Sequence, residues 1–216
     1  MSRLLSDIID TLLPPKCIFC RKTLRRGERD YCAECERSLP YRGRGREPGP
    51  DFVEAVCAPF DYDGKVRTAL MNYKFHGARG CAEAFGRFVA GCVRENLEGE
   101  YDLISWVPLS GARLRERGYD QAMLLAMAAA LELGDVAVET LRKIRDAEPQ
   151  SGKRGLAERR ANISGAYECA DPELVRDKRI LLIDDIVTTG ATVSECARTL
   201  GLAGAESVVC AFAARA

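Results

Sequence analysis

The chain has 216 residues, of which 47% are hydrophobic and 30% are charged, and its formal net charge at pH 7 is zero. This composition indicates a water-soluble protein with one good core and a small additional module, and it excludes a protein built from membrane spans. Residues 1–46 carry eleven Lys and Arg against six Asp and Glu, or plus five, which leaves minus five for the remainder. A basic end suits nucleic-acid contact, although a solvated surface is the commoner explanation and the pI of about 6.6 adds no support.

Residues 1–13 predict a short amphipathic helix. Their leucines and isoleucines fall on one helical face, and Asp7 and Asp10 interrupt the apolar run. The segment is too short to span a membrane and too acidic for a signal peptide. We therefore expect a docking helix, no stable membrane insertion and a cytoplasmic location.

Two Cys-x-x-Cys pairs follow, Cys17 with Cys20 and Cys32 with Cys35. Thiolates delivered in pairs suit tetrahedral zinc, and the polar residues 21–29 between them have too little apolar content to hold a core without a metal. Disulfides are the alternative, but without a secretory signal we expect a reducing compartment, which favours zinc. Four sulfur ligands leave no open coordination position, so the predicted zinc is structural rather than catalytic.

The remaining cysteines have apolar neighbours and no paired spacing, which indicates small buried side chains. They are Cys57, Cys81, Cys92, Cys169, Cys196 and Cys210. Residues 39–50 are rich in proline, glycine and arginine, a pattern that predicts a linker. The chain is therefore expected to divide into a helix and zinc module over residues 1–46 and a larger domain over residues 47–216.

The larger domain opens on residues 52–62, which predict a hairpin or an edge strand. A helix is expected after Gly64 and a second one over residues 83–93, from the helical spacing of their apolar residues. Lys74 lies near the end of the first helix and is a candidate for an anion contact. His76, the single histidine, is more simply a capping residue on a turn than a general base.

An arginine-rich segment follows the next predicted strand, residues 103–107. Arg113, Arg115 and Arg117 precede a strongly apolar helix over residues 122–131. Guanidinium groups suit phosphates geometrically, although an exposed lead-in to a helix explains the pattern equally well. The position after the carboxyl end of a strand favours a ligand-binding role.

Residues 136–141 are another strand candidate, and the polar stretch 143–162 comes next. A loop of that length in a compact domain is usually functional or disordered, and our interpretation is a mobile lid over the active site. Residues 163–169 are expected to return as a strand.

Residues 179–193 are the most informative stretch. The apolar run 180–183 has no polar alternation, which predicts a strand covered on both faces, as in a parallel sheet. Asp184 and Asp185 follow it, and a loop of threonines and glycine then leads into a helix whose free amides suit a phosphate. A further strand over residues 207–212 completes a β-α-β unit.

Two common phosphate-binding motifs do not fit here. A Walker loop needs a Lys followed by Ser or Thr, and a dinucleotide-binding fingerprint has glycines where this turn has Asp and Thr. Four apolar residues, two acids and a Thr-Thr-Gly-x-Thr loop instead resemble the signature of the type I phosphoribosyltransferases. Together with the two cysteine pairs, Tyr-Lys-Phe at 73–75 and the arginine-rich segment ending in Tyr-Asp-Gln at 119–121, this loop resembles the ComF family, including ComFC and GntX, over nearly the whole chain.

The resemblance implies an α/β fold, with a type I phosphoribosyltransferase-like parallel sheet flanked by helices and a small N-terminal zinc-binding module held by four cysteines. It implies that Asp184 and Asp185 contact the ribose hydroxyls of phosphoribosyl pyrophosphate, with Mg²⁺ bridging them to the pyrophosphate. The 5-phosphate would lie on Thr188, Thr189, Gly190, Ala191 and Thr192. Arg113, Arg115 and Arg117 are candidates for the pyrophosphate end. The sequence departs from the family pattern at Asp120, where Asn is expected, and within the lid.

For ComFC the resemblance implies a role in natural transformation, where incoming single-stranded DNA is handled on the cytoplasmic side. Two functions therefore compete. One is a phosphoribosyltransferase that moves a ribose 5-phosphate unit to an acceptor that the sequence does not identify. The other is a non-catalytic accessory protein, whose pocket and zinc module bind single-stranded DNA or partners such as a competence helicase or DNA-processing proteins.

Overall fold

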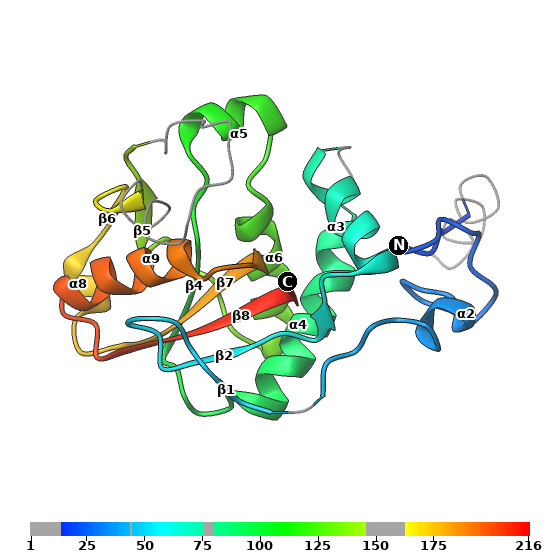
Figure 1. Ribbon diagram of the computed structural model, residues 1–216, viewed down its shortest axis with the longest axis horizontal. Helices are drawn as coiled ribbons and strands as arrows, with labels where there is room; N and C mark the ends of the chain where they lie inside the picture. The colour runs from blue at the N-terminus through cyan, green and yellow to red at the C-terminus, as the bar shows by residue number, and fades with distance from the viewer. Residues whose placement is uncertain (1–13, 44, 76–79, 146–162) are drawn as a thin grey trace.

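The computed structural model describes residues 14–43, 45–75, 80–145 and 163–216, and Figure 1 shows their arrangement. Its helices are α2 (Ala33–Glu36), α3 (Gly64–Phe75), α4 (Cys81–Asn96), α5 (Gly111–Arg117), α6 (Gln121–Leu133), α8 (Pro172–Val175) and α9 (Ala191–Leu202). Its strands are β1 (Glu47–Pro48), β2 (Ala55–Cys57), β3 (Phe60–Asp61), β4 (Leu103–Trp106), β5 (Leu141–Lys143), β6 (Tyr167–Cys169), β7 (Arg179–Val187) and β8 (Ser207–Arg215). The predicted N-terminal helix, His76 and most of the predicted lid lie outside the described residues.

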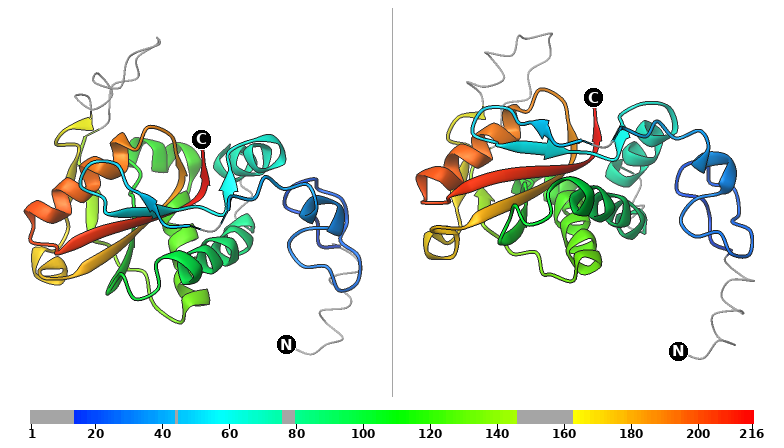
Figure 2. Two further views of the ribbon diagram at one scale, coloured as in Figure 1. Left: turned by 60° about the horizontal axis from the view of Figure 1, so that its bottom comes forward. Right: turned by 90° about the horizontal axis from the view of Figure 1, so that it is seen from below.

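The main sheet has the strand order β1-β2-β8-β7-β4, with β3 also pairing with β8. Every pair in it is parallel except β1 with β2, which form a hairpin. Helices α3, α4 and α6 cover one face and α9 covers the other, so the domain has three layers (Figure 2). The predicted α/β fold with a parallel sheet flanked by helices is therefore confirmed.

Strand β7 has the character that its apolar run predicts. All four residues of the run 180–183 are fully buried. Leu181 and Ile183 join the core beside α4 and α6, whereas Ile180 and Leu182 join the core beside α9. Successive strand residues point to opposite faces of the sheet. Because helices cover both faces here, the side chains on neither face meet water, and the strand can be apolar throughout.

The prediction of a strand over residues 136–141 is wrong. In that stretch only Ala137 forms a bridge, with Ile104, before β5 begins at Leu141. Strand β5 pairs with β6 in a separate antiparallel ribbon of two strands, and β6 begins at Tyr167 rather than at residue 163. Short strands outside the main sheet depend on tertiary contacts, which local propensity does not record.

The sequence predicts a linker over residues 39–50, and its described parts, residues 39–43 and 45–50, contact the larger domain. They contain β1, and Arg42 forms ion pairs with Asp61 and with Glu47. Glu47 also pairs with Arg215 at the end of β8. The division between residues 46 and 47 stays a prediction, because side chains from both parts lie in one core.

The zinc module packs on α4 through aromatic side chains. The ring of Phe19 lies 6.0 Å from those of Phe60 and Phe85 and 6.2 Å from that of Phe88, measured between centroids. Beside this cluster, Asp30 accepts hydrogen bonds from Nε and Nη2 of Arg87, the first at 2.7 Å. No helix among the described residues is long and apolar enough to cross a membrane.

Candidate functional site

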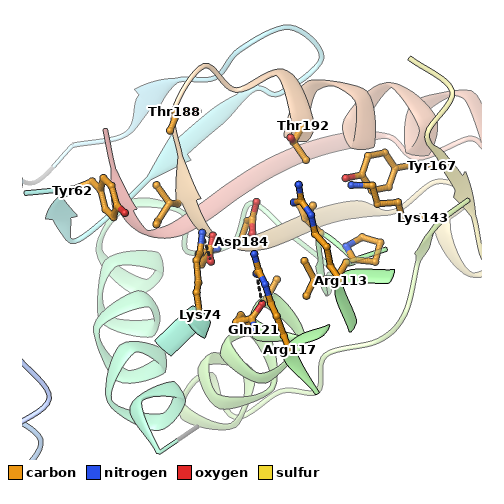
Figure 3. A pocket seen from close by; sticks show the side chains of 16 residues that line it. Tyr62, Lys74, Arg113, Arg117, Gln121, Lys143, Tyr167, Asp184, Thr188 and Thr192 are labelled. Carbon is orange, nitrogen blue, oxygen red and sulfur yellow. Dashed lines mark hydrogen bonds and ion pairs between the residues drawn. The ribbon is translucent and has the colours of Figure 1, made fainter. Parts of the chain in front are cut away.

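A cavity of about 400 Å³ lies at the carboxyl ends of β4 and β7, and polar side chains surround it (Figure 3). The carboxyl ends of parallel strands are the usual place for a ligand in α/β folds. Its charged and aromatic lining residues are Tyr62, Lys74, Arg113, Arg117, Lys143, Tyr167, Asp184 and Asp185. The cavity therefore combines two carboxylates with four cationic side chains.

The two acids point to opposite faces of β7, as strand geometry requires. Asp185 faces α3, where its Oδ2 lies 2.7 Å from Nζ of Lys74, and both side chains are largely buried. Asp184 faces the α9 side, and its Oδ1 accepts a hydrogen bond of 2.8 Å from the backbone N–H of Asp185. Burial, and then the charge of Asp185, raise the pKa of the Asp184 carboxyl to about 8. Lys74 thus engages Asp185, and Asp184 is the acid left to meet a cation or a hydroxyl group in the cavity.

The predicted phosphate loop forms a hollow of about 50 Å³ beside the main cavity, enclosed by residues 186–193 and Asp184. Gly190 has a φ of 76°, and it caps the N-terminus of α9. A Cβ atom there would lie 2.8 Å from the Cβ of Pro50, so the position requires glycine for both conformation and space. The N–H of Ala191, the first residue of α9, donates to Oγ1 of Thr189 at 3.4 Å, and the partial positive charge of the helix N-terminus favours an anion in this hollow.

The three arginines of α5 separate into two groups. Arg113 and Arg117 line the cavity, four residues apart on one face of the helix, whereas Arg115 does not. Nη1 of Arg117 donates a 2.7 Å hydrogen bond to Oε1 of Gln121, which fixes that guanidinium at the start of α6. Lys74 reaches the cavity, but its ammonium group is engaged by Asp185.

Among the charged and aromatic lining residues, three escape the sequence reasoning, namely Tyr62, Lys143 and Tyr167. Nζ of Lys143 lies 5.3 Å above the ring centroid of Tyr167, a cation–π contact across the β5-β6 ribbon. Burial raises the pKa of the Tyr167 phenol, so it stays protonated. The sequence could place Lys143 beside Tyr167 only if the pairing of β5 with β6 were already known.

Asp120, the departure from the family pattern, is the buried N-cap of α6. Its Oδ1 accepts from the backbone N–H of Met123 at 3.1 Å, and its Oδ2 accepts from that of Leu109 at 2.9 Å. Burial raises the pKa of this carboxyl. Asp120 therefore joins the loop after β4 to the start of α6 and helps to fix the arginine-bearing segment between them.

The four cysteines of the N-terminal module lie together. Their Sγ atoms are within 4.8 Å of one another, and those of Cys20 and Cys32 are 3.7 Å apart. Tetrahedral zinc with Zn–S bonds of about 2.3 Å holds its sulfurs about 3.8 Å apart, so the donor set fits zinc. Among the described residues this is the single cluster with metal-binding geometry. None of the ten cysteines forms a disulfide.

Comparison with known proteins identifies the two parts of the chain. Residues 120–216 match the phosphoribosyl transferase domain, and residues 8–46 match the double zinc ribbon domain. The chain is thus a phosphoribosyltransferase-like protein with an N-terminal zinc ribbon, and its four clustered cysteines are a structural zinc site. It is 30% identical to competence protein ComFC of Streptococcus pneumoniae, covering 89% of this chain and 96% of that one. The chain belongs to the ComF family of competence proteins.

Other relatives have similar coverage. Competence protein F of Haemophilus influenzae is 25% identical over 89% of this chain and 93% of its own length. DNA utilization protein YhgH of Salmonella typhi is 26% identical over 91% of this chain and 95% of its own. A solved structure of the allosteric regulatory enzyme of purine biosynthesis aligns with a TM-score of 0.46 and 19% identity, over 66% of this chain and 30% of that one.

Proposed function

We propose that the cavity binds phosphoribosyl pyrophosphate with Mg²⁺, and that this binding serves the handling of DNA taken up during natural transformation. The observation that carries the proposal is the set of groups that line the cavity and the hollow beside it. The phosphate loop and Asp184 line the hollow, and both carboxylates, Arg113 and Arg117 line the cavity. These groups suit a 5-phosphate, a ribose diol and a pyrophosphate.

Each group of residues would bind a different part of phosphoribosyl pyrophosphate. The loop from Thr188 to Thr192 would hold the 5-phosphate through backbone N–H groups and hydroxyls. Asp184 would accept hydrogen bonds from the ribose hydroxyls, and Arg113 and Arg117 would hold the pyrophosphate through charged hydrogen bonds. Mg²⁺, when bound, would neutralise charge on the pyrophosphate oxygens.

A transfer reaction in this site would break the bond between the ribose C1 and the pyrophosphate oxygen. The bonding electrons would leave with pyrophosphate, which Arg113 and Arg117 would stabilise, and positive charge would develop on the ribose ring near Asp184. The acceptor then forms a bond to C1 and loses a proton. A binding role without transfer would use the same contacts.

Isothermal titration calorimetry with phosphoribosyl pyrophosphate and Mg²⁺ tests the proposal. We expect the double variant Asp184→Asn, Asp185→Asn to lose measurable binding. Arg113→Gln and Arg117→Gln should each weaken binding about 10- to 100-fold, since a hydrogen bond to a charged group contributes about 1.5–3 kcal/mol. Arg115→Gln is the matched control and should bind as the wild type does. Equal binding by wild type and the double variant, or none by either, would remove the assignment.

The second candidate is a non-catalytic accessory protein that contacts single-stranded DNA, and the net charge of plus five over residues 1–46 favours it. Phosphate contacts by Lys and Arg release counterions, so binding to a labelled oligonucleotide should weaken steeply as salt is raised. Fluorescence anisotropy measures this dependence. Absence of binding at low salt would exclude the DNA contact while leaving the pocket assignment untouched.

With this function we also propose that the protein is cytoplasmic. Zinc binding needs deprotonated thiols that have not been oxidised to disulfides, and a reducing compartment keeps them so.

A further inference from the structure

An apolar patch lies at the end of α9 that is remote from the phosphate loop. Phe52, in the turn between β1 and β2, is 64% exposed, and Leu202, the last residue of α9, is 76% exposed. Both border a depression of about 230 Å³. Small side chains contribute to its lining, from Ala197, Gly201 and Ala205. The patch therefore combines two projecting apolar side chains with a hollow that could receive similar ones.

The backbone holds Phe52 in an uncommon conformation. Its φ is 65°, in the left-handed region that bulky residues rarely adopt. The turn is closed by a 3.0 Å hydrogen bond from the N–H of Val53 to the carbonyl of Pro50. Pro50 itself lies against Gly190 of the phosphate loop, and Figure 2 shows this turn beside α9. The turn is thus anchored at one end and presents an aromatic ring to solvent at the other.

We propose that this patch is the interface between two copies of the chain, related by a two-fold axis. A two-fold interface brings one patch against itself, so it must be self-complementary. Here Phe52 and Leu202 of each copy would enter the depression of the other. Exposed apolar side chains beside an apolar hollow are typical of interaction surfaces.

The charged residues around the depression also favour a second copy of the chain as the partner. Arg198 and Glu206 both line it, and they carry opposite charges. In a two-fold pair, Arg198 of each copy can face Glu206 of the other, which favours this partner and orientation over others. Arg198 also pairs with Glu195 of its own helix at 2.7 Å, so its guanidinium is already oriented.

Sedimentation velocity of the full-length, zinc-loaded protein over a range of concentrations tests the proposal. We expect the wild type to be a dimer and Leu202→Asp to raise the dimer dissociation constant at least about 30-fold, as loss of an interface hot spot does. Leu131→Asp is the matched control, because Leu131 is 78% exposed on α6, outside the patch, and it should stay dimeric. Circular dichroism and zinc content establish that each variant is folded.

A charge exchange provides a second measurement. Glu206→Arg should weaken the dimer, and adding Arg198→Glu to it should restore much of the affinity. A wild type that is monomeric at every concentration would overturn the proposal and leave the patch for a partner of another kind. A Leu202→Asp variant that dimerises as tightly as the wild type would place the interface elsewhere and overturn it too.

Discussion

Loss of zinc is expected to destabilise the phosphoribosyltransferase-like domain as well as the zinc ribbon. Phe19 lies between two zinc-binding cysteines, is 4% exposed and packs against Phe60 and Phe85 of the larger domain. A structural zinc site supplies about 10–16 kcal/mol of binding free energy, so the knuckle that holds Phe19 does not persist without it. Removing a buried Phe from such a core costs about 3–5 kcal/mol, and we expect a loss of that size.

The measurement is thermal unfolding followed by the fluorescence of Trp106, the single tryptophan, which lies on β4. Cys35→Ser should lower the midpoint temperature that Trp106 reports. Phe19→Ala in zinc-loaded protein should lower it similarly. Cys169→Ser changes a partly buried cysteine outside the cluster and should have little effect. An unchanged Trp106 transition in Cys35→Ser would show that the two parts are energetically independent.

Replacing Lys74 with methionine is expected to cost about 3–5 kcal/mol of folding free energy, because it leaves the carboxylate of Asp185 buried without its cation. The pair is 2.7 Å long, and the two side chains are 19% and 10% exposed. Lys74→Met combined with Asp185→Asn should recover most of the loss, since the uncompensated charge is then absent. Urea unfolding of the wild type, both single variants and the double variant measures the coupling.

The control for this cycle is Lys22 with Glu34, an ion pair of the same length, 2.7 Å, whose side chains are 64% and 62% exposed. Lys22→Met should change the free energy of unfolding very little, because water screens an exposed ion pair. Similar losses for Lys22→Met and Lys74→Met would mean that burial of the pair in the cavity does not determine its contribution.

The parts of the fold that the sequence predicts well are those in which local pattern and burial agree. The apolar run 180–183 predicts a two-sided strand, and both sides of β7 are covered. The spacing of the four cysteines predicts a cluster, and their sulfurs lie within 4.8 Å of one another. In both cases the signal is carried by residues close together in the chain.

The features that the sequence does not predict depend on long-range pairing. The contact between Lys74 and Asp185 joins residues more than a hundred positions apart. The spacing of the three arginines does not show which of them line the cavity. Arg115 is set apart only once α5 places Arg113 and Arg117 on one face of a helix. Residues 136–141 have strand composition, yet the main sheet offers them a single bridge.

The position of β8 also bears on how the chain folds as it is synthesised. β8 is the latest in sequence of the strands in the main sheet, yet it lies between β2 and β7. β4 pairs directly with the acid-bearing β7, but a nascent chain has no strand that joins β2 to β7 until residues 207–215 have been made. The zinc ribbon, whose four cysteine ligands lie within residues 17–35, can bind its metal much earlier. We expect the ligand cavity to be among the last features to form, on a ribbon that has already bound its metal.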